Sequence, residues 1–351
     1  MRPLTASAES LPSDSPMPEG SASTRPLDDS TPSHGASATV SVLMPMRNPG
    51  AFIQFAVDSI LTQECAGLEL LIIDDGSTDG SRAYVDGLAD PRVRVLDGPR
   101  SGIAACMNRG LEFARGEFVM RCDSDDAYPP GRISAQLDFL RRRPDFVGVC
   151  GPFSMTGPAG EEVPPLRISP TTKDEDVAGD ILSDRLRTHL CTFAFRSEVL
   201  RRIGNFRAFF QTAEDIDFQL RLAAAGPIGY LPASAYIYRL HDASITHTQA
   251  SVLRQFFEET AYAMSRERLD RGTDALMRGE AIALPAVRPG DKRADKSGRQ
   301  ISQLLVSEAW KRFRAGDRSG ARQAAWRAAM ASPGYFDAWR SFFLVIAKPR
   351  K

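Results

Sequence analysis

Apolar residues in this chain form short continuous runs that alternate with stretches of helical spacing. Runs of four to six apolar and β-branched residues are typical of strands buried on both faces, and they occur at 40–45, 68–73, 92–96 and 118–121. Between them, apolar residues recur every three or four positions over 51–61 and 103–114, which predicts helices with one buried face. Strands and helices alternating in this way predict an α/β fold, with a mostly parallel sheet flanked by helices.

Acidic side chains follow directly after two of the predicted strands. Asp75 closes the second run, and Asp123, Asp125 and Asp126 follow the fourth. The carboxyl ends of parallel strands meet at one edge of a sheet, where ligands bind. Carboxylates crowded there repel one another unless a cation lies between them. The sequence therefore predicts a metal and nucleotide site at this edge.

Two later clusters strengthen this interpretation. Glu214 and Asp215 open a predicted helix, and His241 follows an aromatic strand at 236–240. Each cluster alone has an ordinary explanation, because carboxylates in a first helical turn suit the helix dipole and an isolated histidine usually lies on the surface. An isolated Asp-x-Asp turn is likewise most often solvated. Several such clusters at the ends of chain segments together favour a functional site.

Composition divides the chain into an ordered domain and less ordered flanks. Residues 1–37 are rich in Ser, Pro and Thr, and we expect a disordered leader because they cannot bury enough apolar surface to offset the entropy of ordering. The α/β domain is expected over 38–272, with a fifth strand at 147–153. The polar stretch 156–186 is either a flap over the site or a surface excursion.

Beyond the domain, the sequence predicts a linker at 273–299 and a helical appendage at 300–351. Gly316 and Asp317, followed by alanines, resemble one tetratricopeptide-type repeat, and one repeat is too few for a solenoid. We expect the appendage to pack on the domain through its large aromatic residues, Trp310, Phe313, Trp326 and Trp339. Contact with an anionic membrane is the alternative, suggested by the basic residues Lys348, Arg350 and Lys351.

Charge and cysteine content narrow the class of protein. Lys and Arg number 44, as do Asp and Glu, so no net field favours a nucleic-acid partner. The five cysteines show no C-x-x-C spacing and are typical of buried thiols in a reducing compartment. No window is long and apolar enough to span a membrane. We expect a cytoplasmic protein, soluble or peripheral at the inner face of the membrane.

Five motifs in a fixed order resemble those of the family 2 glycosyltransferases with the GT-A fold. They are the first strand at 40–45, Asp74–Gly80, Asp123–Asp126, Glu214–Asp217 and Tyr238–His241. The resemblance covers about residues 38–245 and implies an inverting, metal-dependent enzyme. Such an enzyme transfers a sugar from a nucleoside diphosphate sugar, with a UDP-sugar expected first. The acceptor would be a hydroxyl of a glycan, a lipid or another molecule, in cell-surface polysaccharide or glycoconjugate synthesis.

The resemblance also implies roles for donor-binding residues. Asp75 would accept a hydrogen bond from the base, and Asp123 would contact the nucleoside. Asp125 and His241 would hold Mg²⁺ or Mn²⁺ on the diphosphate. The remaining donor-binding residues would be Pro45, Arg47, Asn48, Arg100 and Ser124.

Asp215 would be the catalytic base, with Glu214 and His189 in the acceptor region. This chemistry is understandable without the family, because an acceptor hydroxyl is a poor nucleophile and needs a carboxylate to take its proton. A single displacement of this kind inverts the anomeric carbon. The chain departs from the family pattern at Met107, where an arginine is usual, and at Asn205, where a second glycine often precedes Phe206.

Other function classes fit less well. A catalytically silent module that binds a nucleotide sugar or glycan is the main alternative, and the intact Glu214–Asp215 pair argues against it. A dinucleotide-binding dehydrogenase would need G-x-G-x-x-G after the first strand, and residues 46–50 do not supply it.

Overall fold

The computed structural model describes residues 38–163, 176–186, 188–242, 251–286 and 297–347. The predicted leader lies outside the described residues, as do 164–175 of the predicted flap and 287–296 of the predicted linker.

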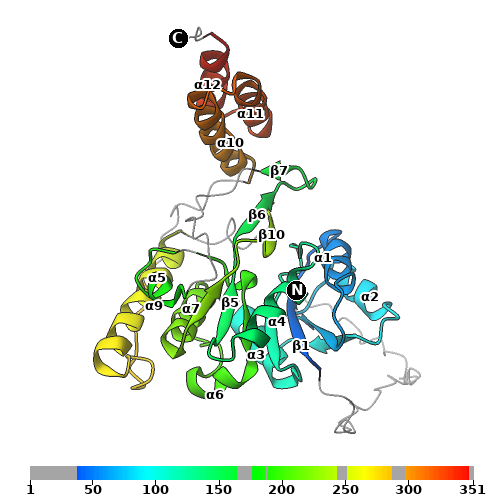
Figure 1. The fold of residues 1–351 in the computed structure, drawn as a ribbon, viewed down its shortest axis with the longest axis vertical. Helices are drawn as coiled ribbons and strands as arrows, with labels where there is room; N and C mark the ends of the chain where they lie inside the picture. The colour runs from blue at the N-terminus through cyan, green and yellow to red at the C-terminus, as the bar shows by residue number, and fades with distance from the viewer. Residues whose placement is uncertain (1–37, 164–175, 187, 243–250, 287–296, 348–351) are drawn as a thin grey trace, which may run out of the picture. The chain divides into compact units, whose positions relative to one another are not determined.

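The predicted α/β fold is confirmed, with a main sheet of seven strands in the order β3-β2-β1-β4-β8-β5-β9 (Figure 1). Its parallel half contains β1 (Val40–Met46), β2 (Leu68–Asp74), β3 (Val93–Asp97) and β4 (Phe118–Arg121). The other half contains β8 (Ala194–Arg196), antiparallel to both neighbours, then β5 (Gly148–Cys150) and β9 (Ile228–Tyr230). The four strands predicted before residue 122 are thus all present.

Helices cover both faces of this sheet. Alternate residues of β1 enter different cores: Val42 and Met44 pack in one, and Leu43 packs in the other. The first core includes residues of α1 (Phe52–Leu61), α2 (Ser81–Asp86) and α4 (Arg132–Arg142). The second includes residues of α3 (Ile103–Phe113), α5 (Ala178–Leu182), α7 (Glu214–Ala225) and α9 (Ser251–Arg271). A 3₁₀ turn at Ser197–Val199 leads into the short α6 (Leu200–Ile203).

The predicted single strand at 147–153 is wrong, because the chain leaves the main sheet after Cys150. Pro152 cannot donate to a strand ladder, and a side chain at Gly151 would meet the carbonyl oxygen of Leu231 at 2.8 Å. The chain resumes as β6 (Phe153–Thr156) in a second sheet of order β10-β6-β7. This sheet also holds β7 (Glu162–Val163) and β10 (Tyr236–Arg239), which is the predicted aromatic strand.

The appendage consists of α10 (Ser297–Arg314), α11 (Arg318–Ala331) and α12 (Phe336–Ala347). Asp317 caps α11, since its carboxylate accepts a hydrogen bond from the Gly320 amide at 2.8 Å. Of the four aromatic residues predicted to dock the appendage, Trp339 packs against a core that includes Met155, Val163 and Leu240, whereas Trp310, Phe313 and Trp326 are not part of that core. The appendage contributes mainly aliphatic side chains to it, namely Ile301, Leu305, Ala328, Ala329 and Ala338. Among the described residues, no helix combines the length and apolar character needed to cross a membrane.

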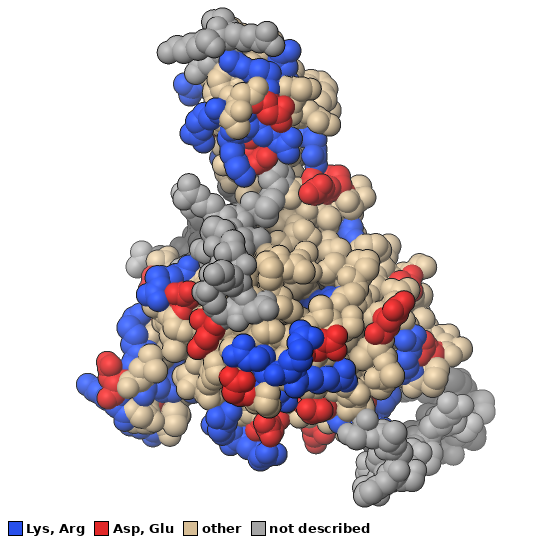
Figure 2. Space-filling model, viewed as in Figure 1, with Lys and Arg blue, Asp and Glu red and all other residues tan. Residues whose placement is uncertain are grey.

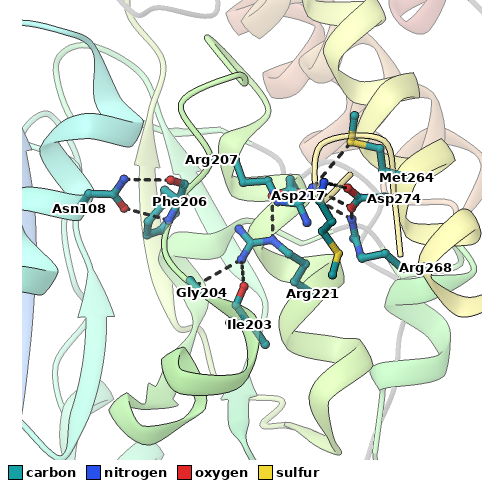
Figure 3. Close-up of polar contacts among 11 residues, drawn as sticks. Asn108, Ile203, Gly204, Phe206, Arg207, Asp217, Arg221, Met264, Arg268 and Asp274 are labelled. Atoms are coloured by element: carbon teal, nitrogen blue, oxygen red, sulfur yellow. Dashed lines mark hydrogen bonds and ion pairs between the residues drawn. The ribbon is translucent and has the colours of Figure 1, made fainter. Parts of the chain in front are cut away.

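Buried ion pairs tie α7 to α9 and to the chain that follows it (Figure 3). Asp217, fully buried on α7, lies 2.9 Å from Arg221, 3.6 Å from Arg207 and 3.7 Å from Arg268. The same Arg207 pairs with Asp274 at 2.8 Å, and Arg268 pairs with Asp274 as well. Asp274 is fully buried although it lies within the predicted linker, so packing of the domain continues past residue 272.

Asp217→Asn should destabilise the protein by about 3 kcal/mol or more, because removal of one partner leaves buried arginines uncompensated. Asp270→Asn, at an exposed position on α9, is the matched control and should change stability little. Urea unfolding gives both values. A loss at Asp217 no larger than that of the control would show that these ion pairs do not stabilise the fold.

Candidate active site

A cavity of about 540 Å³ lies at the carboxyl ends of the parallel strands. It is lined by the loops that follow β1, β2 and β4, by the start of α7, and by residues after β10. Nearly all predicted site residues line it: Pro45, Arg47, Asn48, Asp75, Asp123, Ser124, Asp125, His189, Glu214, Asp215 and His241. Arg100 does not line the cavity. It is exposed, and its side chain lies against Gly76.

Asn48 joins the loops after β1 and β2. Its backbone is left-handed with φ 51°, which asparagine tolerates better than most residues. The side-chain oxygen of Asn48 accepts a hydrogen bond from the Thr78 backbone amide at 2.7 Å. The backbone amide of Asn48 donates to the Ser77 hydroxyl at 3.0 Å. Gly50 adds a bond from its amide to Asp79 at 2.6 Å. These bonds hold the two loops together at the mouth of the cavity.

Asp75 presents a buried acceptor to the cavity. One carboxylate oxygen, Oδ2, accepts a hydrogen bond from the Gly102 amide at 3.3 Å. The other, Oδ1, is buried and accepts no hydrogen bond from the described residues. Burial, together with the Asp75 charge, raises the pKa of the neighbouring Cys106 thiol, which therefore stays neutral. A buried carboxylate oxygen without a donor is costly, and a ligand N–H would satisfy it.

Arg121 connects the end of β4 to the start of α7. Its guanidinium is buried and donates to Asp123 Oδ1 at 2.7 Å and to Glu214 Oε1 at 3.1 Å. Burial acts to raise the pKa of Asp123, but Arg121 and then His189 outweigh it and hold that pKa below its ordinary value. Asp123 therefore stays ionised beside the cavity. The sequence offered no signal for this bridge, because Arg121 reads as the end of an apolar strand.

Asp125 and His241 form a pair that faces the cavity. Oδ2 of Asp125 lies 2.9 Å from Nε2 of His241, and the His241 ring packs on Phe52 with 4.8 Å between ring centroids. The Arg239 side chain donates to the Asp125 carbonyl oxygen at 3.2 Å, which fixes the turn. The Asp125 side chain remains partly exposed, His241 is nearly buried, and both residues line the cavity.

The donor set of this pair fits a divalent cation. A carboxylate oxygen and an imidazole nitrogen are ordinary ligands of Mn²⁺, and the oxygen suits Mg²⁺. Adjacent ligands of an octahedral ion with bonds of about 2.1 Å lie about 3 Å apart. The 2.9 Å between Asp125 Oδ2 and His241 Nε2 matches that separation.

Asp126, the third acid of the turn, has a structural position. It is buried, and its two oxygens accept hydrogen bonds from the Arg239 amide at 2.7 Å and the Tyr236 hydroxyl at 2.8 Å. Burial, followed by the charges of Asp125 and Asp123, raises its pKa well above the ordinary value. Asp126 thereby fastens the acidic turn to β10, which brings His241 next to Asp125.

Asp215 lies in the first turn of α7 and faces the cavity. Its carboxylate makes no hydrogen bond or ion pair with the described residues and is half-buried. The N-cap position of α7 is Ala213, whose backbone is left-handed with φ 59°, so Asp215 does not cap the helix. Burial and the neighbouring Asp215 raise the pKa of Glu214 to about 7. The carboxylate of Asp215 can accept a proton from a bound group.

His189 and Cys191 form a further group with Asp123, whose potential ligand atoms lie within 4.8 Å of one another. The His189 ring stacks on Tyr236 at 6.0 Å, and its Nδ1 accepts a hydrogen bond from the Cys191 amide. Burial raises the pKa of the Cys191 thiol well above its ordinary value. A metal here would need a thiolate and would compete with Arg121 for Asp123, so we interpret the group as packing around Asp123.

Sequence reasoning missed one wall of the cavity. Arg254, Glu258 and Tyr262 of α9 line it, together with Ile181 and Leu186. The sequence carries no signal for which polar residues of α9 face the site.

The raised pKa of Glu214 predicts a pH dependence of stability. The pKa is about 7 in the folded chain against an ordinary value of 4.5, so its contribution is present at low pH and lost as pH rises through about 7. Glu214→Gln cannot ionise and should gain stability relative to the parent between about pH 5 and about pH 8. Urea unfolding at both pH values measures this, with the exposed Glu198→Gln as control. If the stability difference between Glu214→Gln and the parent is the same at both pH values, the pKa of Glu214 is not raised.

Comparison with known proteins agrees with this geometry. Residues 41–213 match the model of the family described as Glycosyl transferase family 2. Chondroitin synthase of Pasteurella multocida is 28% identical over 218 residues, which cover 58% of this chain and 20% of that protein. The uncharacterized glycosyltransferase EpsJ of Bacillus subtilis is 27% identical over 217 residues, 59% of this chain and 62% of that protein. The chain thus spans about a fifth of the first relative and less than two thirds of the second.

Solved structures share the fold. Residues 1–349 of S. aureus TarS in complex with UDP-GlcNAc give a TM-score of 0.50 at 16% identity, covering 88% of this chain and 79% of that one. A second crystal structure of S. aureus TarS residues 1–349 gives a TM-score of 0.50 at 17% identity, covering 85% of this chain and 93% of that one. Residues 41–213 therefore form a glycosyl transferase family 2 domain, and the chain has the GT-A fold.

Proposed function

We propose that this protein is an inverting, metal-dependent glycosyltransferase that moves a sugar from a nucleoside diphosphate sugar to an acceptor hydroxyl. The observation that carries the proposal is the content of one cavity. It holds a buried acceptor at Asp75, the Asp125–His241 pair, and the carboxylate of Asp215 without a bonding partner among the described residues. These groups would supply a nucleoside contact, a cation site and a base, which such a reaction requires.

The donor would lie along the loops that follow β1, β2 and β4. Asp75 Oδ1 would accept the imide N–H of the base, which would satisfy its buried lone pairs. The ionised Asp123 and the neighbouring Ser124 would accept and donate hydrogen bonds to the nucleoside, with Pro45, Arg47 and Asn48 on the facing loop. A uracil base is supported by the UDP-GlcNAc complex of S. aureus TarS. Arg100 would need to move from Gly76 to take part.

Asp125 and His241 would hold Mg²⁺ or Mn²⁺ at the diphosphate end of this path. When bound, the cation would neutralise the charge that develops on the departing diphosphate. The protein prepares this position in two ways. Arg239 fixes the turn through the Asp125 carbonyl oxygen, and Phe52 fixes the ring of His241.

Asp215 would take the proton of the acceptor hydroxyl as the oxygen attacks the anomeric carbon. It is suited to this role because no described residue competes for its carboxylate, and because Glu214 with its pKa of about 7 limits the negative charge beside it. One base and one displacement invert the anomeric centre. The acceptor would enter along the wall formed by Arg254, Glu258 and Tyr262 of α9.

The acceptor class is a glycan or a lipid-linked glycan, in the synthesis of a cell-surface polysaccharide or glycoconjugate. The chondroitin synthase relative, which by name makes a polysaccharide, supports this class. A silent module that only binds a nucleotide sugar is the competing function, and turnover of a donor separates the two.

Asp215→Asn should lower the turnover number by about 10²- to 10⁴-fold while leaving donor affinity nearly unchanged, because the amide keeps the shape but cannot take a proton. Asp337→Asn, also in the first turn of a helix but in the appendage, is the matched control. Transfer is measured over a panel of nucleotide sugars with saturating acceptor. Turnover by Asp215→Asn within a few-fold of the parent would exclude Asp215 as the base.

The affinity for UDP should be higher with a divalent cation than without one. Asp125→Ala should lower the UDP affinity measured in Mn²⁺ by at least about tenfold, so that the cation has little remaining effect. Calorimetric titration of UDP with Mn²⁺ and with EDTA measures both effects. Asp138→Ala, on the exposed face of α4, is the control and should bind UDP as the parent does. Equal UDP affinity of the parent in Mn²⁺ and EDTA would rule out the metal site.

A further inference from the structure

Large apolar side chains of α11 and α12 face solvent. Phe336 is 75% exposed, Phe343 61%, Met330 53% and Trp326 47%. Trp326 and Met330 are one turn apart on α11, and Phe336 and Phe343 are two turns apart on α12, so each pair shares one face of its helix. We call these residues, together with Trp339 and Ile346, the aromatic face.

The aromatic face is continuous across the two helices. Ring centroids of Trp326 and Trp339 lie 6.2 Å apart, and those of Trp339 and Phe343 lie 6.3 Å apart. Phe342 lies between the helices, 5.4 Å from Trp326. Single exposed apolar residues are common on soluble proteins, whereas contiguous exposed apolar groups mark interaction sites.

Packing within the appendage does not account for these side chains. The buried face of α11 consists of the alanines at 321, 324, 325, 328 and 329. The two largest apolar side chains of this helix, Trp326 and Met330, point outward. An ordinary amphipathic helix buries its largest apolar side chains. The arrangement of α11 is the reverse, so the outward residues serve contact with something outside the chain.

Positive charge accompanies the aromatic face. Residues 297–347 carry eight Lys or Arg side chains and three Asp or Glu, although the whole chain has no net charge. Figure 2 shows Lys and Arg spread over the appendage with few acidic groups among them. Arg322 lies one turn before Trp326, and Arg340 lies one turn after Phe336, and both are exposed. The sequence that follows α12 adds Lys348, Arg350 and Lys351.

We propose that the aromatic face binds the surface of an anionic lipid bilayer, with α11 and α12 lying in the interface. Tryptophan and phenylalanine insert at the level of the headgroups, and arginines beside them pair with anionic lipids. A second copy of the chain is the less suitable occupant, because a symmetric dimer would bring two positively charged appendages together. The proposal concerns a surface separate from the catalytic cavity, and it holds or fails independently of the transferase reaction.

Flotation of the full chain with lipid vesicles tests this binding. The protein should float with phosphatidylcholine vesicles that contain phosphatidylglycerol, and should float poorly with phosphatidylcholine alone or at high salt. The double variant Phe336→Ser/Phe343→Ser should bind the anionic vesicles at least about tenfold more weakly. Leu269→Ser, which removes an exposed leucine of α9 outside the aromatic face, should bind as the parent does.

Thermal unfolding and sedimentation complete the test. The double variant should melt within a few degrees of the parent, because the substituted rings are exposed. If the phenylalanine double variant melts well below the parent, the double variant Arg322→Glu/Arg340→Glu is used in its place. This charge-reversed variant should also lose vesicle binding. Absence of vesicle binding by the parent, or equal binding by all variants, would overturn the proposal. A parent dimer that dissociates in the double variant would overturn it as well, because the face would then be a contact between copies.

Discussion

The buried guanidinium of Arg121 is the interaction on which the site depends. It pairs with Asp123 at the end of β4 and with Glu214 at the start of α7, residues that lie far apart in sequence. A buried charge is tolerated only when partners compensate it, so the strand end and the helix start are held at a fixed separation. That separation places the Asp125–His241 pair and the carboxylate of Asp215 in one cavity.

The acidic turn shows how burial gives three neighbouring carboxylates different states. Asp123 is kept ionised by Arg121, Asp125 is partly exposed and faces the cavity, and Asp126 is buried with a raised pKa. Repulsion among the three is thereby reduced, because the raised pKa of Asp126 favours its neutral form. The division of roles follows from the position of β10, whose Tyr236 and Arg239 satisfy Asp126.

A second group of ion pairs supports the same helix from its other side. Asp217 is two residues from Asp215, and its contacts with Arg207, Arg221 and Arg268 join α7 to α9. The arginines outnumber the carboxylates in this cluster, and the backbone oxygens of Ile203 and Gly204 accept hydrogen bonds from Arg221. The first turn of α7, which carries Asp215, is therefore held by ion pairs both on the cavity side and on the opposite side.

The sequence by itself determined the alternation of strands and helices, because buried strands and one-faced helices require distinct spacings of apolar residues. It also determined that the acids at strand ends share one edge, since parallel strands end together. Tertiary structure decided which acid pairs with which group, because Arg121, Tyr236 and Arg239 act on residues distant in the chain. It also decided that the run at 147–153 divides at Pro152, and that the alanines of α11 face inward while its tryptophan does not. Periodicity reports that a face is apolar, whereas the shape of the neighbouring surface selects which apolar residues it can accommodate.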